Sequence, residues 1–535
     1  MFSLVVLSFL VLAFSSEGIH PDLKIYFDLI DLNYNGKITS EELSVFFDRF
    51  YEEKPDTIVL SPPTLSPMTK AMLDKLIHRY NRNSTIDYLI LSDLDRAFNE
   101  LYSLQSDQVP NAIYEGLVPE QVHLSYTHNI HNQMFISFVT RGRPTSNLRP
   151  IIKYGNQGCI VTGNTTTYNI SGWHYWIHYI FIDNLEPGMK YSYQLGFMES
   201  DNKTIPYIYS NEMWTFKTMP ARTNLQREFV YIYGDMGTFM PMGIEVMKAI
   251  VSDFVNNIDE QPDYVVHVGD IAYGGTGSEI EIQPIWDLFM NQIAPIASQI
   301  PYMTATGNHE KYFNYTSYQT RFFMPSKTDP SSFEIDGNFY FTLETNLVQW
   351  IFISTEHNYT KDTSQRLFLE NALKQYQQKW EFKQRPWLIV VGHRPMYTSD
   401  KGSNSGRLQD ELEPLLVEYG VDLAVWGHQH CYERTTPVKF NNVTDHDHFS
   451  PDGKVYKHNA TTADQTSPIH LTIGMAGALI NETWLPQPAW SHVRYATFGF
   501  GKLYIHNETH LQFKTILLDP TVVDVEDGFM IIRQF

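Results

Sequence analysis

The residues with the clearest chemical potential are seven nitrogen and oxygen donors, each placed just after a short apolar run that ends in glycine. The runs cover residues 229–233, 264–268, 301–306, 387–391 and 421–426. The donors that follow them are Asp235, Asp270, Tyr273, Asn308, His393, His428 and His430. A single Gly-Asp or Gly-His pair carries almost no information, whereas five such blocks in succession indicate a built site. Seven donors are too many for one tetrahedral zinc ion and suit two metal ions that share a carboxylate.

The spacing of the apolar runs indicates the elements that must position these donors. The first three runs start roughly 30 to 40 residues apart with helix-capable segments between them, which is the spacing of βαβ units. Parallel strands connected in this way place their carboxyl ends at one edge, where open α/β sheets build their sites. Glycine at each strand end lets the backbone turn sharply and approach a ligand closely. We therefore expect the seven donors to converge at the strand ends of an α/β fold.

Five sequence blocks carry a resemblance to a known family. In chain order they read GDMG (234–237), GDIAY (269–273), GNHE (307–310), VVGH (390–393) and GHQH (427–430). They resemble the signature blocks of the purple acid phosphatases within the metallophosphoesterase superfamily, and the tyrosine of GDIAY is their distinguishing residue. The resemblance implies an α/β metallophosphoesterase sandwich, in which two β-sheets are flanked by helices and the metals lie at the sheet ends.

The resemblance also implies a division of the donors between two metal ions. Asp235, Tyr273 and His430 would hold Fe(III). Asn308, His393 and His428 would hold a divalent ion (Zn²⁺, Fe²⁺ or Mn²⁺), and Asp270 would bridge the two ions. The donor chemistry agrees with this division, because hard anionic oxygens suit Fe(III) whereas imidazole and a neutral amide oxygen suit a divalent ion.

The resulting hypothesis is an acid phosphatase (EC 3.1.3.2-like) that hydrolyses phosphate monoesters by attack of a metal-bound hydroxide on phosphorus. His309 is the expected proton donor to the leaving alkoxide, with orientation of the site as its alternative role. Residues 394–405 contain no histidine, so Arg394, Tyr397 and Lys401 are the candidates for substrate contacts. Two other functions stay open: a phosphodiesterase or nucleotide pyrophosphatase on the same centre, and a calcium-binding interaction protein with a vestigial phosphatase domain.

Composition and targeting signals set the cellular context. The chain has 535 residues, a formal net charge of −21 and 43% hydrophobic residues, which favours several packed domains and argues against nucleic-acid binding. Residues 1–17 form an apolar run typical of a signal peptide and too short for a membrane span. Ten glycosylation sequons fit a secretory route: Asn83, Asn164, Asn169, Asn202, Asn314, Asn358, Asn442, Asn459, Asn481 and Asn507.

We therefore expect a secreted or lysosome-like glycoprotein that acts on small phosphate esters and has no membrane anchor. A homodimer stays an open alternative. So does a disulfide between the two cysteines of the chain, Cys159 and Cys431.

Residues 31–42 match the twelve-residue calcium loop of an EF-hand. Side-chain oxygens fall at loop positions 1, 3, 5, 9 and 12, glycine at 6 and isoleucine at 8, and position 7 supplies a main-chain carbonyl. The predicted calcium ligands are Asp31, Asn33, Asn35, Lys37, Thr39 and Glu42. Because only Asp31 and Glu42 are acidic, the expected affinity is modest. A second, degenerate hand with Arg79 at loop position 1 and Ile90 at position 12 is expected to pair without binding calcium, so that residues 18–106 form an α-helical EF-hand pair.

Residues 107–221 contain a series of short segments with the alternating residue pattern of β-strands. Strands are predicted at 121–125, 134–139, 177–182, 190–195 and 213–218, a pattern typical of a β-sandwich. The segment resembles the fibronectin-III-like domain that precedes the catalytic domain of long-form purple acid phosphatases. The catalytic domain is expected at 222–535, with closing strands at 497–504, 507–510 and 528–532.

Overall fold

The computed structural model describes residues 115–534 apart from 171, 174, 200–206, 209–212, 224–225, 239, 241, 258–259, 275–281, 326–337, 382–384, 402–405, 445–449, 451, 459–466, 481–482 and 519–526, together with residues 38–39 and 88–89. The predicted signal peptide and, apart from two short strands, the predicted EF-hand pair lie outside the described residues. The two strands, β1 (Ile38–Thr39) and β2 (Tyr88–Leu89), pair antiparallel and join the two predicted hands. The calcium site itself stays a prediction.

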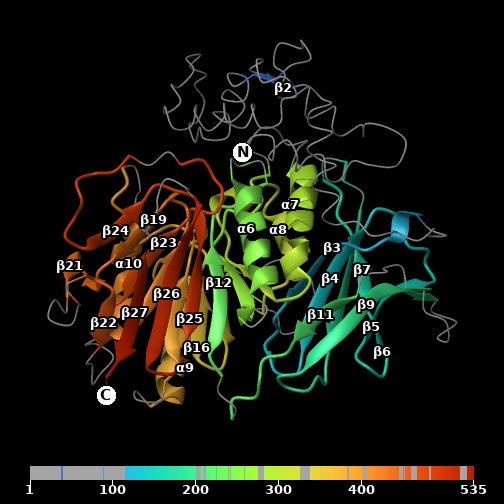
Figure 1. The fold of residues 1–535 in the computed structure, drawn as a ribbon, viewed down its shortest axis with the longest axis horizontal. Coiled ribbons are helices and arrows are strands. Elements are labelled where there is room, and N and C mark those ends of the chain that lie inside the picture. Colours follow the sequence, from blue (N-terminus) through green and yellow to red (C-terminus); the bar gives the residue numbers. More distant parts are fainter. Residues whose placement is uncertain are drawn as a thin grey trace.

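The N-terminal part of the described chain is a pair of antiparallel β-sheets (Figure 1). After η1 (Glu115–Leu117), one sheet has the order β3 (Glu120–Ser125), β4 (Met134–Thr140), β8 (Trp176–Ile182) and β7 (Asn164–Thr166). The other has the order β10 (Tyr207–Ile208), β9 (Lys190–Glu199), β5 (Leu148–Tyr154) and β6 (Cys159–Thr162), with β11 (Trp214–Lys217) also paired to β9. Phe138 and Ile180 of the first sheet share a buried cluster with Leu195 of the second. The predicted β-sandwich is thus present, while its fibronectin-III-like character stays a prediction.

Two seven-stranded sheets form the larger part of the chain. The first has the order β14 (Tyr302–Thr304), β13 (Tyr264–His267), β12 (Glu228–Tyr233), β25 (Gly499–Ile505), β26 (His510–Leu517), β27 (Gly528–Arg533) and β22 (Val455–His458). The second has the order β15 (Phe341–Glu344), β16 (Val348–Phe352), β17 (Trp387–Val391), β18 (Leu423–Trp426), β23 (Ile469–Ile473), β19 (Tyr432–Thr435) and β24 (Ser491–Tyr495). A hairpin of β20 (Val438–Lys439) and β21 (Asn442–Val443) lies outside both sheets. The α/β metallophosphoesterase sandwich is therefore present.

The five strands expected to deliver the donors are divided between these sheets. β12, β13 and β14 are parallel neighbours in the first sheet, and β17 and β18 are parallel neighbours in the second. One expected closing strand is wrong, because residues 507–509 form a turn between β25 and β26. The Asn507 side-chain oxygen accepts the main-chain N–H groups of Thr509 and His510, which favours a turn over a strand.

Alternating burial shows how the second sheet is sandwiched. Ile389 and Val391 of β17 belong to the cluster that also contains the first sheet, whereas Leu388 and Val390 pack with α9 (Ser364–Lys379) and α10 (Gly406–Glu418). Successive strand residues point to opposite faces, so β17 is buried on both sides. α6 (Gly243–Asn256) and α7 (Ile282–Ala297) pack in the same core as the first sheet.

A buried polar network fixes the N-terminal sandwich to α7 and to α8 (Thr316–Arg321). Arg321 lies 2.8 Å from the Asp287 carboxylate, and Nε1 of Trp173 donates to the same carboxylate at 2.8 Å. The Arg321 guanidinium also lies over the Trp173 ring, 4.6 Å from its centroid. A paired, fully hydrogen-bonded ion pair of this kind specifies one relative orientation of the packed parts.

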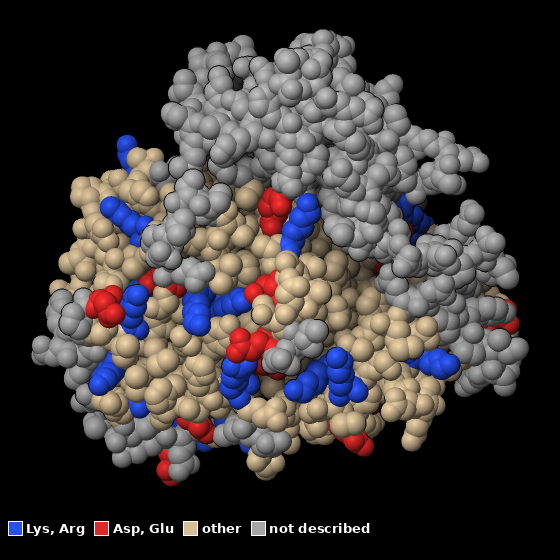
Figure 2. All heavy atoms as spheres, viewed as in Figure 1, with Lys and Arg blue, Asp and Glu red and all other residues tan. Residues whose placement is uncertain are grey.

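The exposure of the sequon asparagines and of the two cysteines is relevant to the predicted secretory route. Basic and acidic side chains are interspersed over the described part of the face in Figure 2. The six sequon asparagines within the described residues, Asn164, Asn169, Asn314, Asn358, Asn442 and Asn507, are all exposed, and the other four lie outside those residues. Cys159 is exposed and Cys431 is buried, and both are free thiols. Among the described residues, no helix is long and apolar enough to cross a membrane.

Candidate metal centre

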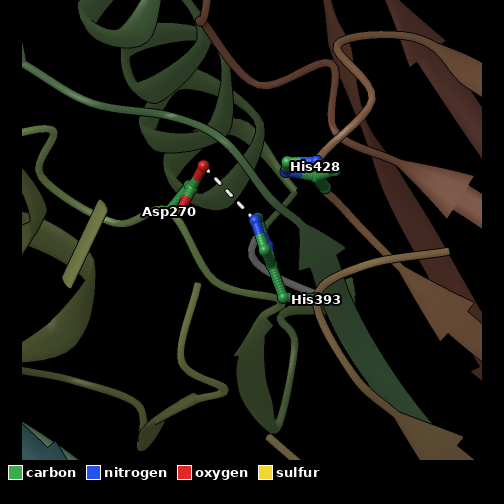
Figure 3. A group of neighbouring side chains, drawn as sticks. All are labelled: Asp270, His393 and His428. Atoms are coloured by element: carbon green, nitrogen blue, oxygen red, sulfur yellow. Dashed lines mark ion pairs between the residues drawn. The ribbon is translucent and has the colours of Figure 1, made fainter. Parts of the chain in front are cut away.

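The strand ends of the two sheets bring all seven predicted donors to one place. Asp235 follows β12, Asp270 and Tyr273 follow β13, and Asn308 opens the short helix η3 (Asn308–Glu310) after β14. His393 follows β17 in the other sheet, and His428 and His430 lie between β18 and β19. Six of the seven side chains are buried and His428 is half-buried. Figure 3 shows Asp270, His393 and His428 pointing toward a common centre.

Four of these donors have a backbone conformation that is uncommon for residues other than glycine. The φ angles are 58° at Asp235, 48° at Asp270, 56° at Tyr273 and 68° at His428. Positive φ costs such residues free energy and persists where the surrounding structure imposes it, as it does at functional sites. The turns after β12, β13 and β18 thus contain left-handed residues that orient these four donors.

Glycines make room for the donor carboxylates. A Cβ atom added at Gly307 would lie 2.2 Å from Oδ1 of Asp270, and one added at Gly427 would lie 2.5 Å from Oδ2 of Asp235. Both distances are far below van der Waals contact. Glycine is thus required at both positions, because the backbone there passes close to the carboxylates of the centre.

Asp235, Tyr273 and His430 form the first group of donors. The Tyr273 hydroxyl oxygen lies 3.2 Å from Oδ1 of Asp235 and 3.0 Å from Nε2 of His430. Nε2 of His430 lies 3.6 Å from the same Asp235 oxygen. Nδ1 of His430 lies 2.8 Å from the Leu479 carbonyl oxygen and donates to it, which turns Nε2 toward the group.

Asn308, His393 and His428 form the second group, and Asp270 adjoins it. Nε2 of His393 lies 3.2 Å from Oδ1 of Asn308 and 3.3 Å from Oδ2 of Asp270. Nδ1 of His393 donates to the Val268 carbonyl at 3.0 Å. One donor atom from each of Asp270, His393 and His428 falls within 4.8 Å of the others, a geometry that could hold a metal ion.

The protonation equilibria of the group indicate a missing positive charge. Burial lowers the pKa of His430 to about 4, and burial together with the neighbouring His393 and Arg394 lowers the pKa of His428 well below its usual range. Burial would also lower the pKa of His393, but the Asp270 carboxylate raises it to about 10. Burial also raises the pKa of Asp235 well above its usual range, so the buried cluster disfavours uncompensated negative charge, which a metal ion bound to deprotonated ligands would offset. The donor set therefore fits two metal ions.

Glu310 stabilises the loops of the centre, and it was not among the site residues predicted from the sequence. Its buried carboxylate accepts the main-chain N–H groups of Asp270 at 3.0 Å, Ile271 at 2.8 Å and Gly307 at 2.8 Å. These bonds tie the loop after β13 to the loop after β14. The signal in the sequence is its place as the last residue of the GNHE block. A buried carboxylate requires several hydrogen-bond donors, and the main-chain N–H groups of the two loops supply them.

His309 lies at the mouth of the centre. Its side chain is 18% exposed, and its Nε2 lies 3.9 Å from Oδ2 of Asp270. Its ring centroid lies 4.4 Å from that of Tyr273. The position gives the ring access both to solvent and to the donor cluster.

The three candidates for substrate contacts are in different environments. Tyr397 is buried and its hydroxyl donates to Glu413, so it serves the packing of α10. Lys401 is exposed, and its main-chain N–H donates to the Thr483 carbonyl. Arg394 contacts the centre directly, because its Nη1 lies 2.9 Å from Nε2 of His428.

Comparison with known proteins places this geometry in a family. Residues 119–218 match the model for the N-terminal domain of purple acid phosphatases, and residues 230–432 match the calcineurin-like phosphoesterase model. Residues 467–525 match the model for the iron/zinc purple acid phosphatase-like protein C. The three matches follow in order and include the whole donor cluster. Over these three segments the chain is similar to the purple acid phosphatases. Proteins of this family use iron together with a divalent metal.

Individual relatives share the family at moderate identity. The chain is 28% identical to acid phosphatase type 7 of Danio rerio over 432 residues, covering 75% of this chain and 88% of that protein. It is 29% identical to the "Probable inactive purple acid phosphatase 9" of Arabidopsis thaliana, covering 73% of this chain and 64% of the plant protein. The structure of purple acid phosphatase PPD1 from yellow lupin seeds matches with a TM-score of 0.65 at 26% identity, covering 78% of this chain and 75% of that one.

Proposed function

We propose that this protein is an acid phosphatase that hydrolyses phosphate monoesters at a binuclear centre of Fe(III) and a divalent ion. One observation carries the proposal: seven donors from two sheets form two groups, which are linked where the main-chain N–H of His428 donates to the Asp235 carboxylate at 2.9 Å. Similarity to the purple acid phosphatases supports the reaction class. It does not by itself establish activity, because relatives include a protein described as probably inactive.

In this proposal each group of donors holds one ion. Asp235, Tyr273 and His430 would hold Fe(III), Asn308, His393 and His428 would hold the divalent ion, and Asp270 would contribute to both sites. When bound, the two ions would activate a water nucleophile and offset charge that develops on the phosphoryl oxygens.

The protein side chains supply orientation and a proton. His430 and His393 are oriented by the carbonyl groups of Leu479 and Val268, which leaves each Nε2 available as a ligand. His309 holds a proton at the mouth of the centre and delivers it to the leaving oxygen.

Two other functions remain to be tested on the same protein. A phosphodiesterase or nucleotide pyrophosphatase would use the same ions with a wider substrate site. A calcium-binding interaction protein with a vestigial phosphatase domain would retain the fold without turnover. The complete donor set favours an active centre over a vestigial one.

The deciding experiment compares p-nitrophenyl phosphate with bis(p-nitrophenyl) phosphate as substrates of the purified protein at acidic pH, with metal content measured on the same sample. The proposal expects turnover of the monoester well above that of the diester. It also expects Asp270→Asn to lose both activity and bound metal, since Asp270 is the proposed shared ligand. Preference for the diester would support the alternative enzyme, and a metal-loaded protein without turnover would support the vestigial domain.

The remaining expectations extend this proposal to the whole chain. We infer a secreted or lysosome-like glycoprotein with a signal peptide at 1–17, acting on small phosphate esters without nucleic-acid partners or a membrane anchor. The proposed domains are an EF-hand pair at 18–106 with a Ca²⁺ site at 31–42, an N-terminal phosphatase domain at 107–221 and a catalytic domain at 222–535. The exposed sequon asparagines support the glycoprotein assignment.

A further inference from the structure

Arg394 is held so that its guanidinium points into the centre. Its main-chain N–H donates to the Thr355 hydroxyl at 2.9 Å, and its Nε and Nη2 donate to the Glu356 carboxylate at 2.9 and 3.1 Å. The Nη1 group, on the other side of the fork, donates to Nε2 of His428 at 2.9 Å. Glu356 thus anchors one side of the guanidinium and leaves Nη1 directed at the centre.

The contact between Arg394 and His428 cannot coexist with His428 as a metal ligand. Arginine has only donors, so Nε2 of His428 must present a lone pair to Nη1. A metal ion on Nε2 would use that lone pair. A metal ion on Nδ1 of a neutral imidazole would leave the ring proton on Nε2, facing the arginine donor. In either tautomer, the hydrogen bond from Arg394 to His428 must break when His428 binds a metal ion.

The chemistry of the freed donor suits the phosphate group of the substrate. The whole chain carries a net charge of −21, so a cation beside the centre would favour the approach of a dianionic substrate. A guanidinium is planar, always charged and matched to the oxygens of phosphate. Glu356 already fixes its orientation, which lowers the entropy lost on binding.

We propose that Arg394 binds the phosphoryl oxygens of the substrate when His428 serves as a metal ligand. This inference rests on the proposed function and names the side chain that recognises its substrate. Arg394 therefore acts together with the divalent ion in binding phosphate.

The test measures binding rather than turnover. Inorganic phosphate is titrated calorimetrically into the metal-loaded protein, and Zn²⁺ into chelator-stripped protein, for wild type, Arg394→Met and Arg394→Lys. Arg149→Met, which removes an exposed arginine of the N-terminal sandwich, is the matched control. Loss of a hydrogen bond to a charged group predicts about 10- to 100-fold weaker phosphate binding in Arg394→Met. Arg394→Lys should lie between it and wild type, and Zn²⁺ should bind Arg394→Met at least as tightly as wild type.

A double variant separates direct phosphate binding from simple neutralisation of Glu356. In Arg394→Met the unpaired Glu356 carboxylate would itself repel phosphate, and Arg394→Met/Glu356→Gln removes that charge. Direct binding predicts that the double variant stays weak for phosphate. Recovery to wild-type affinity would overturn the proposal, as would unchanged phosphate binding or parallel loss of Zn²⁺ affinity in Arg394→Met. Phosphate binding is measurable without catalysis, so an inactive wild type would reject the phosphatase while leaving this test intact.

Discussion

At the scale of single residues, the centre depends on backbone conformations that most side chains avoid. Asp235, Asp270, Tyr273 and His428 all sit in the left-handed region, and a carboxylate of each donor group accepts main-chain N–H bonds that hold the turn. His428 donates to Asp235 through its main chain, so a ligand of one proposed ion is positioned by a ligand of the other. The two sites are therefore expected to assemble together.

Tyr273 provides a spectroscopic test of the ferric assignment. A phenolate bound to Fe(III) gives a visible charge-transfer band, so the metal-loaded protein should be violet. Tyr273→Phe should lose the band and retain the fold, because the ring is buried and only its hydroxyl is removed. Visible absorption and iron content of the two proteins check this expectation. A wild type that is active, colourless and free of iron would rule out the ferric site.

His309 provides a kinetic test of the proton donor. A leaving group of high pKa needs a proton, whereas an activated phenolate leaves without one. His309→Ala should therefore slow alkyl phosphates by about 10²- to 10³-fold, on the scale of general acid catalysis, and aryl phosphates much less. The measurement is kcat/KM for both substrate classes at matched metal content. Equal slowing of the two classes would assign His309 to orienting the site through its contacts with Asp270 and Tyr273.

At the scale of elements, the first sheet carries metal-ligand candidates at one edge and a buried carboxyl at the opposite edge. β12 begins at Glu228, whose carboxylate accepts the main-chain N–H of Leu347 at 2.6 Å and the Tyr264 hydroxyl at 3.1 Å. These bonds join the start of β12 to the turn before β16 and to the start of β13. Burial nevertheless dominates and raises the pKa of Glu228 to about 7.

This carboxyl predicts how stability depends on pH. The pKa in the folded protein lies above the ordinary value of 4.5, so the contribution is fully present below about pH 4.5 and is lost as the pH rises through about 7. A shift of this size corresponds to about 3 kcal/mol of unfolding free energy. Between pH 5 and 8 the melting temperature should fall, and Glu228→Gln should reduce that fall. Denaturation curves at several pH values check this, with the exposed Glu186→Gln as control. An identical pH slope in Glu228→Gln would exclude the assignment.

At the scale of the whole molecule, separate parts are fixed around the centre by buried contacts. The N-terminal sandwich is locked to α7 and α8 through Arg321, Asp287 and Trp173. α8 follows closely on the loop that carries Asn308 and His309. The sandwich therefore supports a segment that adjoins the mouth of the centre, which gives it a structural role in addition to any role in assembly.

The predicted calcium loop at 31–42 gives a test at the same scale. Ca²⁺ should bind with an affinity typical of extracellular modules, about 10⁻⁴ to 10⁻³ M, and should raise the melting temperature by mass action. Glu42→Gln should abolish both effects because the bidentate ligand is lost. Asn81→Ala in the degenerate hand is the matched control and should leave binding unchanged. Calorimetry that shows no calcium uptake dependent on Glu42 would refute the site.

The sequence by itself determined the identities of the donors and the turns that carry them. Apolar runs of β-branched and aromatic residues ended by glycine predicted β12, β13, β14, β17 and β18, because local pattern and turn chemistry act over a few residues. The chemical types of Asp235, Asp270, Tyr273 and the three histidines predicted a metal centre without coordinates. The turn at 507–509 was mistaken for strand, since short polar segments carry little periodicity.

Only the tertiary structure decided which strands share a sheet and which side chains brace the site. The division of the donor strands between two sheets depends on packing that joins residues far apart in the chain. The hydrogen bonds of Glu310 depend on the same packing, since its main-chain donors lie up to 40 residues away in sequence. So does the hydrogen bond from Arg394 to His428. Burial and hydrogen-bond satisfaction are properties of the assembled core, so a sequence pattern can name the donors but cannot show what holds them.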